Sequence, residues 1–251
     1  MRVLYAGDSE AGGPANYLLG ILRLLRARVT HIPPSRKLKP SLFKKRFDVI
    51  IVSDFSKRNT PVSSEKAIVN QIEEGSGLLM VGGWGSFSGP YGGWHGSKLE
   101  KLLPVNCLNR DDRVNLPGGA FIALKGKHAM FRSLSFKNPP VICGLNRVQP
   151  KKGSTILLSV REMISPPSFS SLRKAGGGLR WGEEFPLLII DSNPHKRIAA
   201  LTTDLAPHWC GGLVDWGRRH LKLRVNDKIQ IEAGNLYVRF VSNLLKWLGR
   251  V

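Results

Sequence analysis

Cysteines, acidic side chains and long apolar runs are all scarce in this sequence. The three cysteines, Cys107, Cys143 and Cys210, lie far apart and form no Cys-x-x-Cys pair, so neither a disulfide framework nor a zinc site is indicated. No apolar run approaches the roughly 20 residues that span a bilayer, and we expect no signal peptide and no membrane anchor. These absences predict a cytoplasmic protein.

The shortage of acidic residues leaves a large positive charge. Thirty-eight Lys and Arg residues face 18 Asp and Glu residues, giving a formal net charge of +20, and such a surface attracts polyanions. The basic residues are spread along the chain and are densest in residues 35–46 and 218–224. Neither segment carries a zinc-finger, helix-turn-helix or RNA-platform motif. We therefore interpret the charge as a solvated basic surface, and we keep nucleic-acid binding as an alternative that no motif supports.

Short apolar runs alternate with amphipathic segments in the first third of the chain. The predicted strands are residues 2–6, 29–33, 48–52 and 78–81, and the predicted helices are residues 14–27 and 63–74, the second capped by Ser63 or Ser64. Continuous apolar strands that alternate with helices predict a parallel sheet covered on both faces.

Strands follow one another more closely in the second half. They are predicted at residues 121–125, 141–149, 154–160, 186–191 and 197–204, with the last two forming a hairpin, and a closing helix is predicted at residues 231–248. Residues 161–185 are rich in Ser, Pro and Gly and predict a loop or lid insertion. The predicted fold is one α/β domain over residues 1–251: a doubly wound, mostly parallel sheet with helices on both faces and a mixed C-terminal part.

Polar residues and glycines follow several of the predicted strands. Ligands of open parallel sheets bind beyond the carboxyl ends of the strands, where these segments converge. One of them, residues 82–96, reads GGWGSFSGPYGGWHG, a composition suited either to a ligand cleft or to a buried turn. The predicted ligand-binding residues are Asp8, Ser9, Asp54, Gly82, Gly83, Trp84, Ser86, Ser88, Asp204, His208 and Trp209.

The sequence evidence for a catalytic motif is weaker than the evidence for a ligand site at the strand ends. A glutaminase of class I needs a cysteine on a sharp strand-to-helix turn between small residues. Only Cys210, with His208 two residues before it and glycines after it, is a catalytic candidate. The aspartates could ligate a divalent metal, but carboxylates at strand ends more often cap helices or bind loop amides. We therefore predict no metal. No phosphate-binding glycine fingerprint is present, and we predict no cofactor.

Several segments together resemble a known family. They are GLLMVGGWGSFSG, LEKLLPV, DDRV, GLNRVQPKKGSTIL, PLLII and ALTTDLAPHW, which occur in this order from residue 77 to residue 209. The chain resembles the putative glutamine amidotransferase-like family of cytoplasmic proteins, and the resemblance implies a flavodoxin-like fold related to class I glutamine amidotransferases. It departs from that pattern in the insertion at residues 161–185 and in the turn at residues 193–196.

The expected function is binding of a small polar ligand at the strand ends, without glutaminase activity. We expect no association with a membrane. One alternative is a hydrolase or amidotransferase that uses Cys210 or a divalent metal. The other is a polyanion-binding or assembly protein that uses the basic surface. The sequence leaves open whether the chain forms a homo-oligomer.

Overall fold

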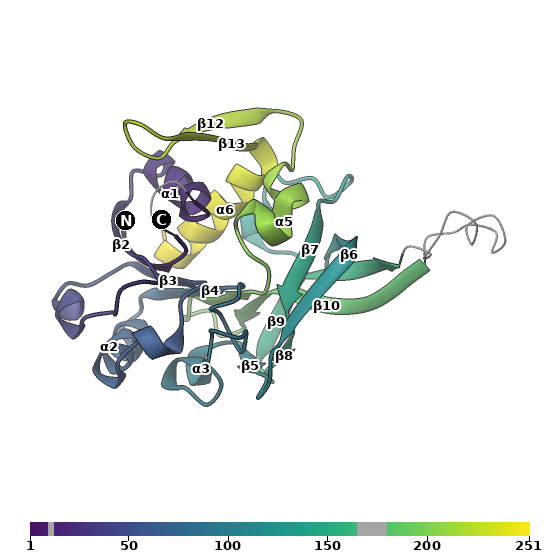
Figure 1. Ribbon diagram of the computed structural model, residues 1–251. Helices are drawn as coiled ribbons and strands as arrows, with labels where there is room; N and C mark the ends of the chain where they lie inside the picture. Colours follow the sequence, from purple (N-terminus) through teal and green to yellow (C-terminus); the bar gives the residue numbers. More distant parts are fainter. Residues whose placement is uncertain (10–12, 165–179) are drawn as a thin grey trace.

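The computed structural model describes residues 1–9, 13–164 and 180–251 (Figure 1). Its main sheet contains β1 (Arg2–Gly7), β2 (Arg28–Ile32), β3 (Val49–Ser53), β4 (Gly77–Val81), β6 (Arg113–Leu124), β7 (Val141–Asn146), β9 (Ser154–Ile164), β10 (Arg180–Asp191) and β11 (Ile198–Leu201). Two small ribbons pair β5 (Val105–Cys107) with β8 (Val148–Pro150) and β12 (His220–Arg224) with β13 (Gln230–Gly234). The helices are α1 (Ala15–Leu24), α2 (Val62–Glu73), α3 (Lys98–Leu102), α5 (Pro207–Val214) and α6 (Asn235–Gly249), with 3-10 turns η1 (Pro40–Lys44), η2 (Lys57–Asn59) and η3 (Ala129–Phe131).

The main sheet has a parallel half and an antiparallel half. Its strand order is β2-β1-β3-β4-β11-β10-β9-β6-β7. The pairs from β2 to β11 are parallel, whereas those from β11 to β7 are antiparallel. The predicted α/β fold with a mixed C-terminal part is confirmed, including the hairpin of β10 and β11, in which Leu188 pairs with Leu201.

The parallel strands are buried on both faces because their side chains alternate between two cores. Val3 and Tyr5 of β1 belong to the core that also contains residues of α1 and α6. Leu4 and Ala6 belong to the opposite core, with residues of α2 and α3. This arrangement explains why the strands read as unbroken apolar runs.

The predicted cap of α2 is wrong. The helix begins at Val62 after Pro61, and no side chain caps it. Ser64 lies inside the first turn, where its buried hydroxyl donates a hydrogen bond of 2.7 Å to the carbonyl of Leu38. The hydroxyl therefore binds a neighbouring loop instead of the helix end.

The ends of the predicted insertion are strands rather than loop. In the ribbon of β9 and β10, Arg161 pairs with Glu184 and Val160 with Phe185. The Arg161 guanidinium lies 5.6 Å from the Trp181 ring, which also meets Phe121 edge-on, and these contacts favour pairing over the Ser- and Gly-rich composition. The remainder of the predicted insertion, residues 165–179, lies outside the described residues.

The closing helix begins four residues later than predicted. Residues Gln230–Gly234 form β13, and α6 begins at Asn235. A side chain at Gly234 would come within 2.2 Å of the Trp216 carbonyl oxygen, so the backbone passes too closely there for another residue. Residues His220–Arg224 of the basic segment form β12, whose Leu223 is buried against α1 at Gly20.

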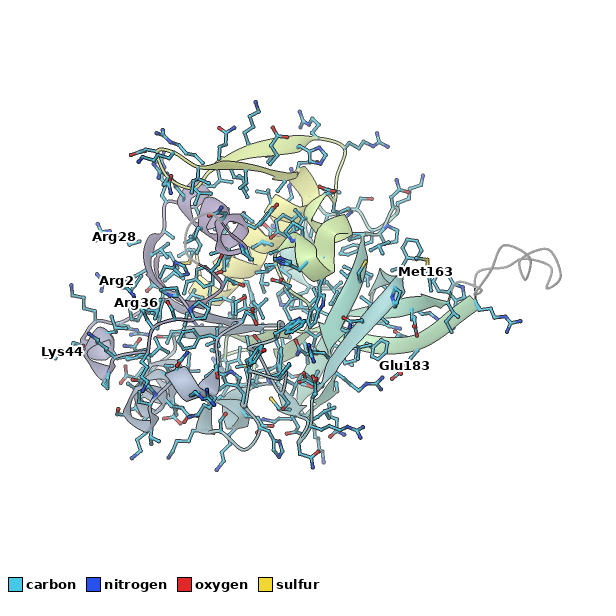
Figure 2. All side chains as sticks on the ribbon, in the orientation of Figure 1. Arg2, Arg28, Arg36, Lys44, Met163 and Glu183 are labelled. Atoms are coloured by element: carbon cyan, nitrogen blue, oxygen red, sulfur yellow. The ribbon has the colours of Figure 1, made fainter. Side chains whose placement is uncertain are left out.

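Positive charge is distributed over several parts of the surface. Arg2, Arg28 and Lys44 line one cavity beside β2, the edge strand of the parallel half (Figure 2). Other basic side chains extend from β12 and α6 on a different side of the molecule. The interpretation of this charge as a solvated basic surface stays a prediction.

Candidate functional site

Asp8 and Asp54 lie side by side at the carboxyl ends of β1 and β3. The Asp8 amide donates a 3.0 Å hydrogen bond to the Ser53 carbonyl, which ties the two strand ends together. Both aspartates have positive φ angles, +48° and +50°, a conformation that Asp tolerates better than most residues. Gly7 is required before this turn, because a β-carbon there would come within 1.5 Å of the Ser53 carbonyl oxygen.

Asp8 is a buried carboxyl group among other acids. Burial and the nearby Asp204 raise its pKa to about 8, although a hydrogen bond from the buried Tyr5 hydroxyl works in the opposite direction. Burial likewise raises the pKa of Asp54, and the Gly85 amide, which donates to Asp54 Oδ1, partly offsets that effect. At neutral pH Asp8 therefore holds a proton and can donate a hydrogen bond.

Asp204 and His208 form a pair at the start of α5. His208 Nδ1 lies 3.7 Å from Asp204 Oδ2, and Asp204 Oδ1 also accepts a 3.1 Å hydrogen bond from the Ala206 amide. The contact with Asp204 raises the pKa of His208, and Asp8 and Asp54 act on it in the same direction. Loops that are distant in sequence thus bring three carboxyl groups and one imidazole into one electrostatic neighbourhood, as predicted from the strand ends.

A buried polar network holds the glycine-aromatic loop, residues 82–96. Asn146, at the end of β7, accepts from the Gly83 amide at 2.8 Å and donates to the Gly83 carbonyl at 3.2 Å. Its amide also donates to Asp112 at 2.6 Å, and Asp112 accepts from the Ser88 amide at 2.7 Å. Burial raises the pKa of Asp112 to about 6. Sequence reasoning missed Asn146, although an asparagine that ends an apolar strand was a usable signal.

The predicted glycines and serines of the loop hold the backbone in place. A β-carbon would lie 2.1 Å from the Thr202 carbonyl oxygen at Gly82 and 2.7 Å from Asp54 Oδ1 at Gly83, where φ is +153°. The Ser86 hydroxyl accepts from the Asp54 amide at 2.9 Å, and the Ser88 hydroxyl donates to the Leu108 carbonyl. These groups therefore shape the strand-end edge by internal bonds.

The aromatic side chains of the loop divide into two pairs. Phe87 and Trp94 are fully buried, and the Trp94 indole donates a 2.9 Å hydrogen bond to the Phe55 carbonyl. Trp84 and Tyr91 are 49% and 65% exposed, stack on each other, and lie beside Arg113, whose guanidinium is 4.2 Å from the Trp84 ring. Phe87 and Trp94 thus fix the loop to the core, whereas Trp84 and Tyr91 form an exposed aromatic surface.

A cavity of about 780 Å³ opens beside this edge. Asp54 is the predicted ligand-binding residue that lines it. Gly85 and Tyr91 of the glycine-aromatic loop, Pro34, and Lys57 and Arg58 of η2 also line it. The other predicted residues lie around this edge in different settings. Ser9 is exposed after β1, and Trp209 is buried with its indole against Gly144 of β7.

The cysteines do not provide an accessible nucleophile at a strand end. Cys210 is fully buried inside α5, its thiol donates to the Ala206 carbonyl at 3.1 Å, and burial raises its pKa well above the ordinary value. Cys107 is also buried with a raised pKa, and Cys143 is exposed in the middle of β7. Across residues 1–9, 13–164 and 180–251, no three His, Cys, Asp or Glu side chains form a group that could hold a metal ion.

Comparisons with known proteins find a matching family and several similar structures. A family model described as putative glutamine amidotransferase matches residues 44–170. The Cytoplasmic Protein STM3548 from Salmonella typhimurium is 20% identical over 98% of both chains, with a TM-score of 0.71. A second cytoplasmic protein from that organism, STM1381, is 23% identical over 83% of this chain and 90% of its own, with a TM-score of 0.63.

A putative ThuA-like protein from Bacteroides uniformis has the same fold, at 13% identity and a TM-score of 0.55 over 99% of this chain and 91% of its own. Among curated proteins none shows significant sequence similarity. Within the described ranges, no helix is long and apolar enough to cross a membrane.

Proposed function

This chain belongs to the putative glutamine amidotransferase family, and we propose that it binds a small polar ligand at the strand ends without hydrolysing glutamine. The observation that carries the proposal is the cavity of about 780 Å³ whose lining includes Asp54, beside the region where Asp8, Asp204 and His208 converge. Its volume is typical of ligand sites in proteins, which range over roughly 300–1,000 Å³.

The lining indicates what kind of ligand fits. Asp54 offers a carboxyl group that accepts hydrogen bonds, and Tyr91 offers an exposed aromatic face. Arg58, which also lines the cavity, is a donor with no acidic partner among the described residues. A small molecule with hydroxyl or amino groups beside Asp54 and an acceptor group toward Arg58 satisfies these groups together.

The thiol chemistry of a glutaminase is unsupported by these contacts. Covalent amide hydrolysis requires a thiolate that reaches the substrate carbonyl and a base that activates it. Cys210 would have to leave its bond to the Ala206 carbonyl and its buried position inside α5. The alternative of a Cys210-dependent hydrolase or amidotransferase is therefore disfavoured.

We also propose a cytoplasmic location. Two of the structures that resemble this chain are named cytoplasmic proteins. The three cysteines are unpaired, as expected in a reducing compartment. Trapping the thiols in intact cells before lysis should find them reduced, and a disulfide-linked fraction would contradict this location.

A thermal-shift screen of metabolites tests the ligand site. The expected result is a ligand that stabilises the wild type but loses most of its effect in Arg58→Ala and Tyr91→Ala, which alter exposed side chains of the cavity. Lys222→Ala, which removes the same charge as Arg58→Ala from an exposed position on β12, is the matched control. A stabilising ligand that is insensitive to both cavity variants would overturn the placement of the site.

An ammonia assay tests the chemistry separately. Purified protein with glutamine should release no more ammonia than the Cys210→Ala variant. Ammonia release that the cysteine substitution abolishes would overturn the absence of glutaminase activity and leave the ligand result unaffected.

A further inference from the structure

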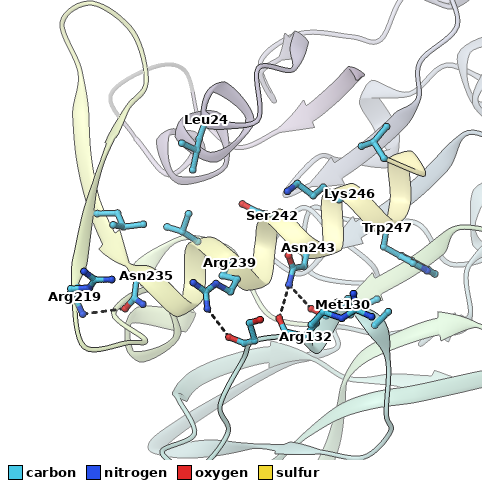
Figure 3. Close-up of a pocket in the computed structure, with 15 residues that line it drawn as sticks. Leu24, Met130, Arg132, Arg219, Asn235, Arg239, Ser242, Asn243, Lys246 and Trp247 are labelled. Atoms are coloured by element: carbon cyan, nitrogen blue, oxygen red, sulfur yellow. Dashed lines mark hydrogen bonds between the residues drawn. The ribbon is translucent and has the colours of Figure 1, made fainter.

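A second large cavity lies along α6 (Figure 3). It is on the face of the sheet opposite to α2 and α3. Its volume is about 810 Å³. The floor is α6, one wall is formed by the end of α1 and by β12, and the other wall is η3 with the residues that follow it (Figure 3). We call this cavity the α6 groove.

Four basic side chains line the α6 groove and no acidic side chain does. Arg132, Arg219, Arg239 and Lys246 are all exposed. None of the four forms an ion pair with a described residue, whereas the exposed acids Asp111, Glu183, Glu184 and Asp227 have Lys or Arg partners elsewhere. Arg239 donates to the Ser133 carbonyl at 2.9 Å, a bond that fixes its position and leaves its charge uncompensated. The groove is therefore a concave region of positive potential.

Polar side chains form a stripe along α6, and two of them, Arg239 and Lys246, are charged. Asn235, Arg239, Asn243 and Lys246 are spaced by four, four and three residues, which places them on one face of α6. With a rise of about 1.5 Å per residue, this stripe is about 16 Å long. Arg219 and Arg132 flank it from the two walls (Figure 3). The apolar surfaces of Leu24 and Trp247 lie beside the charges.

We propose that the α6 groove binds single-stranded nucleic acid through its phosphate backbone. A single strand carries one negative charge per nucleotide, so several of its phosphates can reach unpaired cations that are spread along the groove and on both of its walls, which one isolated anion cannot do. Three of the four cations are arginines, whose planar guanidinium groups suit phosphate. The groove is concave, and Trp247, whose ring contacts Arg197 and His128, is partly exposed and offers its remaining surface to a base, the usual combination in proteins that bind single strands.

The proposal is tested by fluorescence anisotropy with a labelled 12-nucleotide oligothymidylate over a salt titration. The test variant is Arg132→Gln/Arg219→Gln/Lys246→Gln, since no side-chain hydrogen bond or ion pair to a described residue would be lost. The matched control, Lys66→Gln/Lys98→Gln/Lys101→Gln, removes the same charge from exposed positions on α2 and α3, on the opposite face. Circular dichroism and thermal melts establish that both variants are folded.

The wild type should show a slope of log K against log salt of about −3, because each phosphate contact contributes about −0.7 for a single strand. In the test variant the slope should become shallower by about 2, and binding should be at least about tenfold weaker at moderate salt. The control should retain both the slope and the affinity of the wild type. Equal weakening in the two variants, or no binding by the wild type at low salt, would overturn the proposal. Tighter binding of a duplex, or of an oligoglutamate peptide, with the same sensitivity to the test variant would overturn the single strand as the occupant.

Discussion

Replacing Asp8 with Asn should remove a strong pH dependence from the stability of this protein. The pKa of Asp8 is about 8 in the fold against an ordinary value of 3.8, chiefly because the group is buried and secondly because of Asp204. Asn keeps the shape of the side chain, tolerates the φ of +48°, and offers an amide oxygen to the Tyr5 hydroxyl. The substitution therefore isolates the titration of one carboxyl group.

The sign and size follow from the proton balance. Between about pH 5 and pH 8 the unfolded chain has released this proton while the folded chain retains it, so unfolding becomes easier as the pH rises. The stabilisation that comes from the proton on Asp8 is fully present below the ordinary pKa. It is lost as the pH rises to the pKa of Asp8 in the folded state. Each pH unit lowers the free energy of unfolding by about 1.4 kcal/mol, which gives an upper value of about 4 kcal/mol over this interval. Asp8→Asn should thus gain stability relative to the wild type steadily from pH 5 to pH 8.

Urea unfolding followed by tryptophan fluorescence at several pH values measures this difference. Ile51→Val is a suitable control, because it removes one buried methylene from β3 and adds no titrating group. Its free energy of unfolding should differ from that of the wild type by the same amount at every pH. A wild-type minus Asp8→Asn difference that is constant over this range would refute the reasoning.

Three further substitutions test the loop at residues 82–96. Gly83→Val should destabilise the fold by about 2 kcal/mol or more, because its φ is +153° and the new β-carbon would lie 2.7 Å from Asp54 Oδ1; unchanged thermal unfolding and ligand response would contradict this. Asn146→Leu should cost about 3 kcal/mol, since it leaves the Gly83 amide and a buried Asp112 oxygen without partners, and an unfolding midpoint in urea equal to that of the wild type would count against the network. Trp94→Phe should cost about 2 kcal/mol through the lost bond to Phe55 and the space left behind, a change that calorimetry can detect; no shift in melting temperature would show that the indole is dispensable.

The parallel half and its strand-end site were predictable because their signals are local. Each parallel strand is one apolar run, and the topology itself places Asp8, Asp54 and Asp204 at one edge. The division of the aromatic residues was not predictable: Trp84 and Trp94 share one loop, but only Trp94 faces the Phe55 carbonyl and the core. The β12–β13 ribbon was also missed, because Leu223 is buried by contact with α1, some 200 residues earlier in the chain.

The α6 groove was beyond sequence reasoning for a related reason. The basic residues that line it are Arg132 just after η3, Arg219 just before β12, and Arg239 and Lys246 of α6, and no short stretch of the chain contains them together. The sequence showed the excess of positive charge but not which cations would remain without acidic partners. That depends on how the acids are distributed in space.

The position of β11 has a consequence for how this chain folds as it is synthesised. One side of β4 pairs with β3, which is close in sequence, but its other side pairs with β11, more than a hundred residues later. A ribosome that has released β4 has therefore exposed an apolar strand whose second edge has no partner until the C-terminal half emerges. Such high contact order slows folding, and an open apolar edge favours association between nascent chains. The protein should consequently depend on chaperones during synthesis more than the finished sheet suggests, in which β4 is paired on both sides.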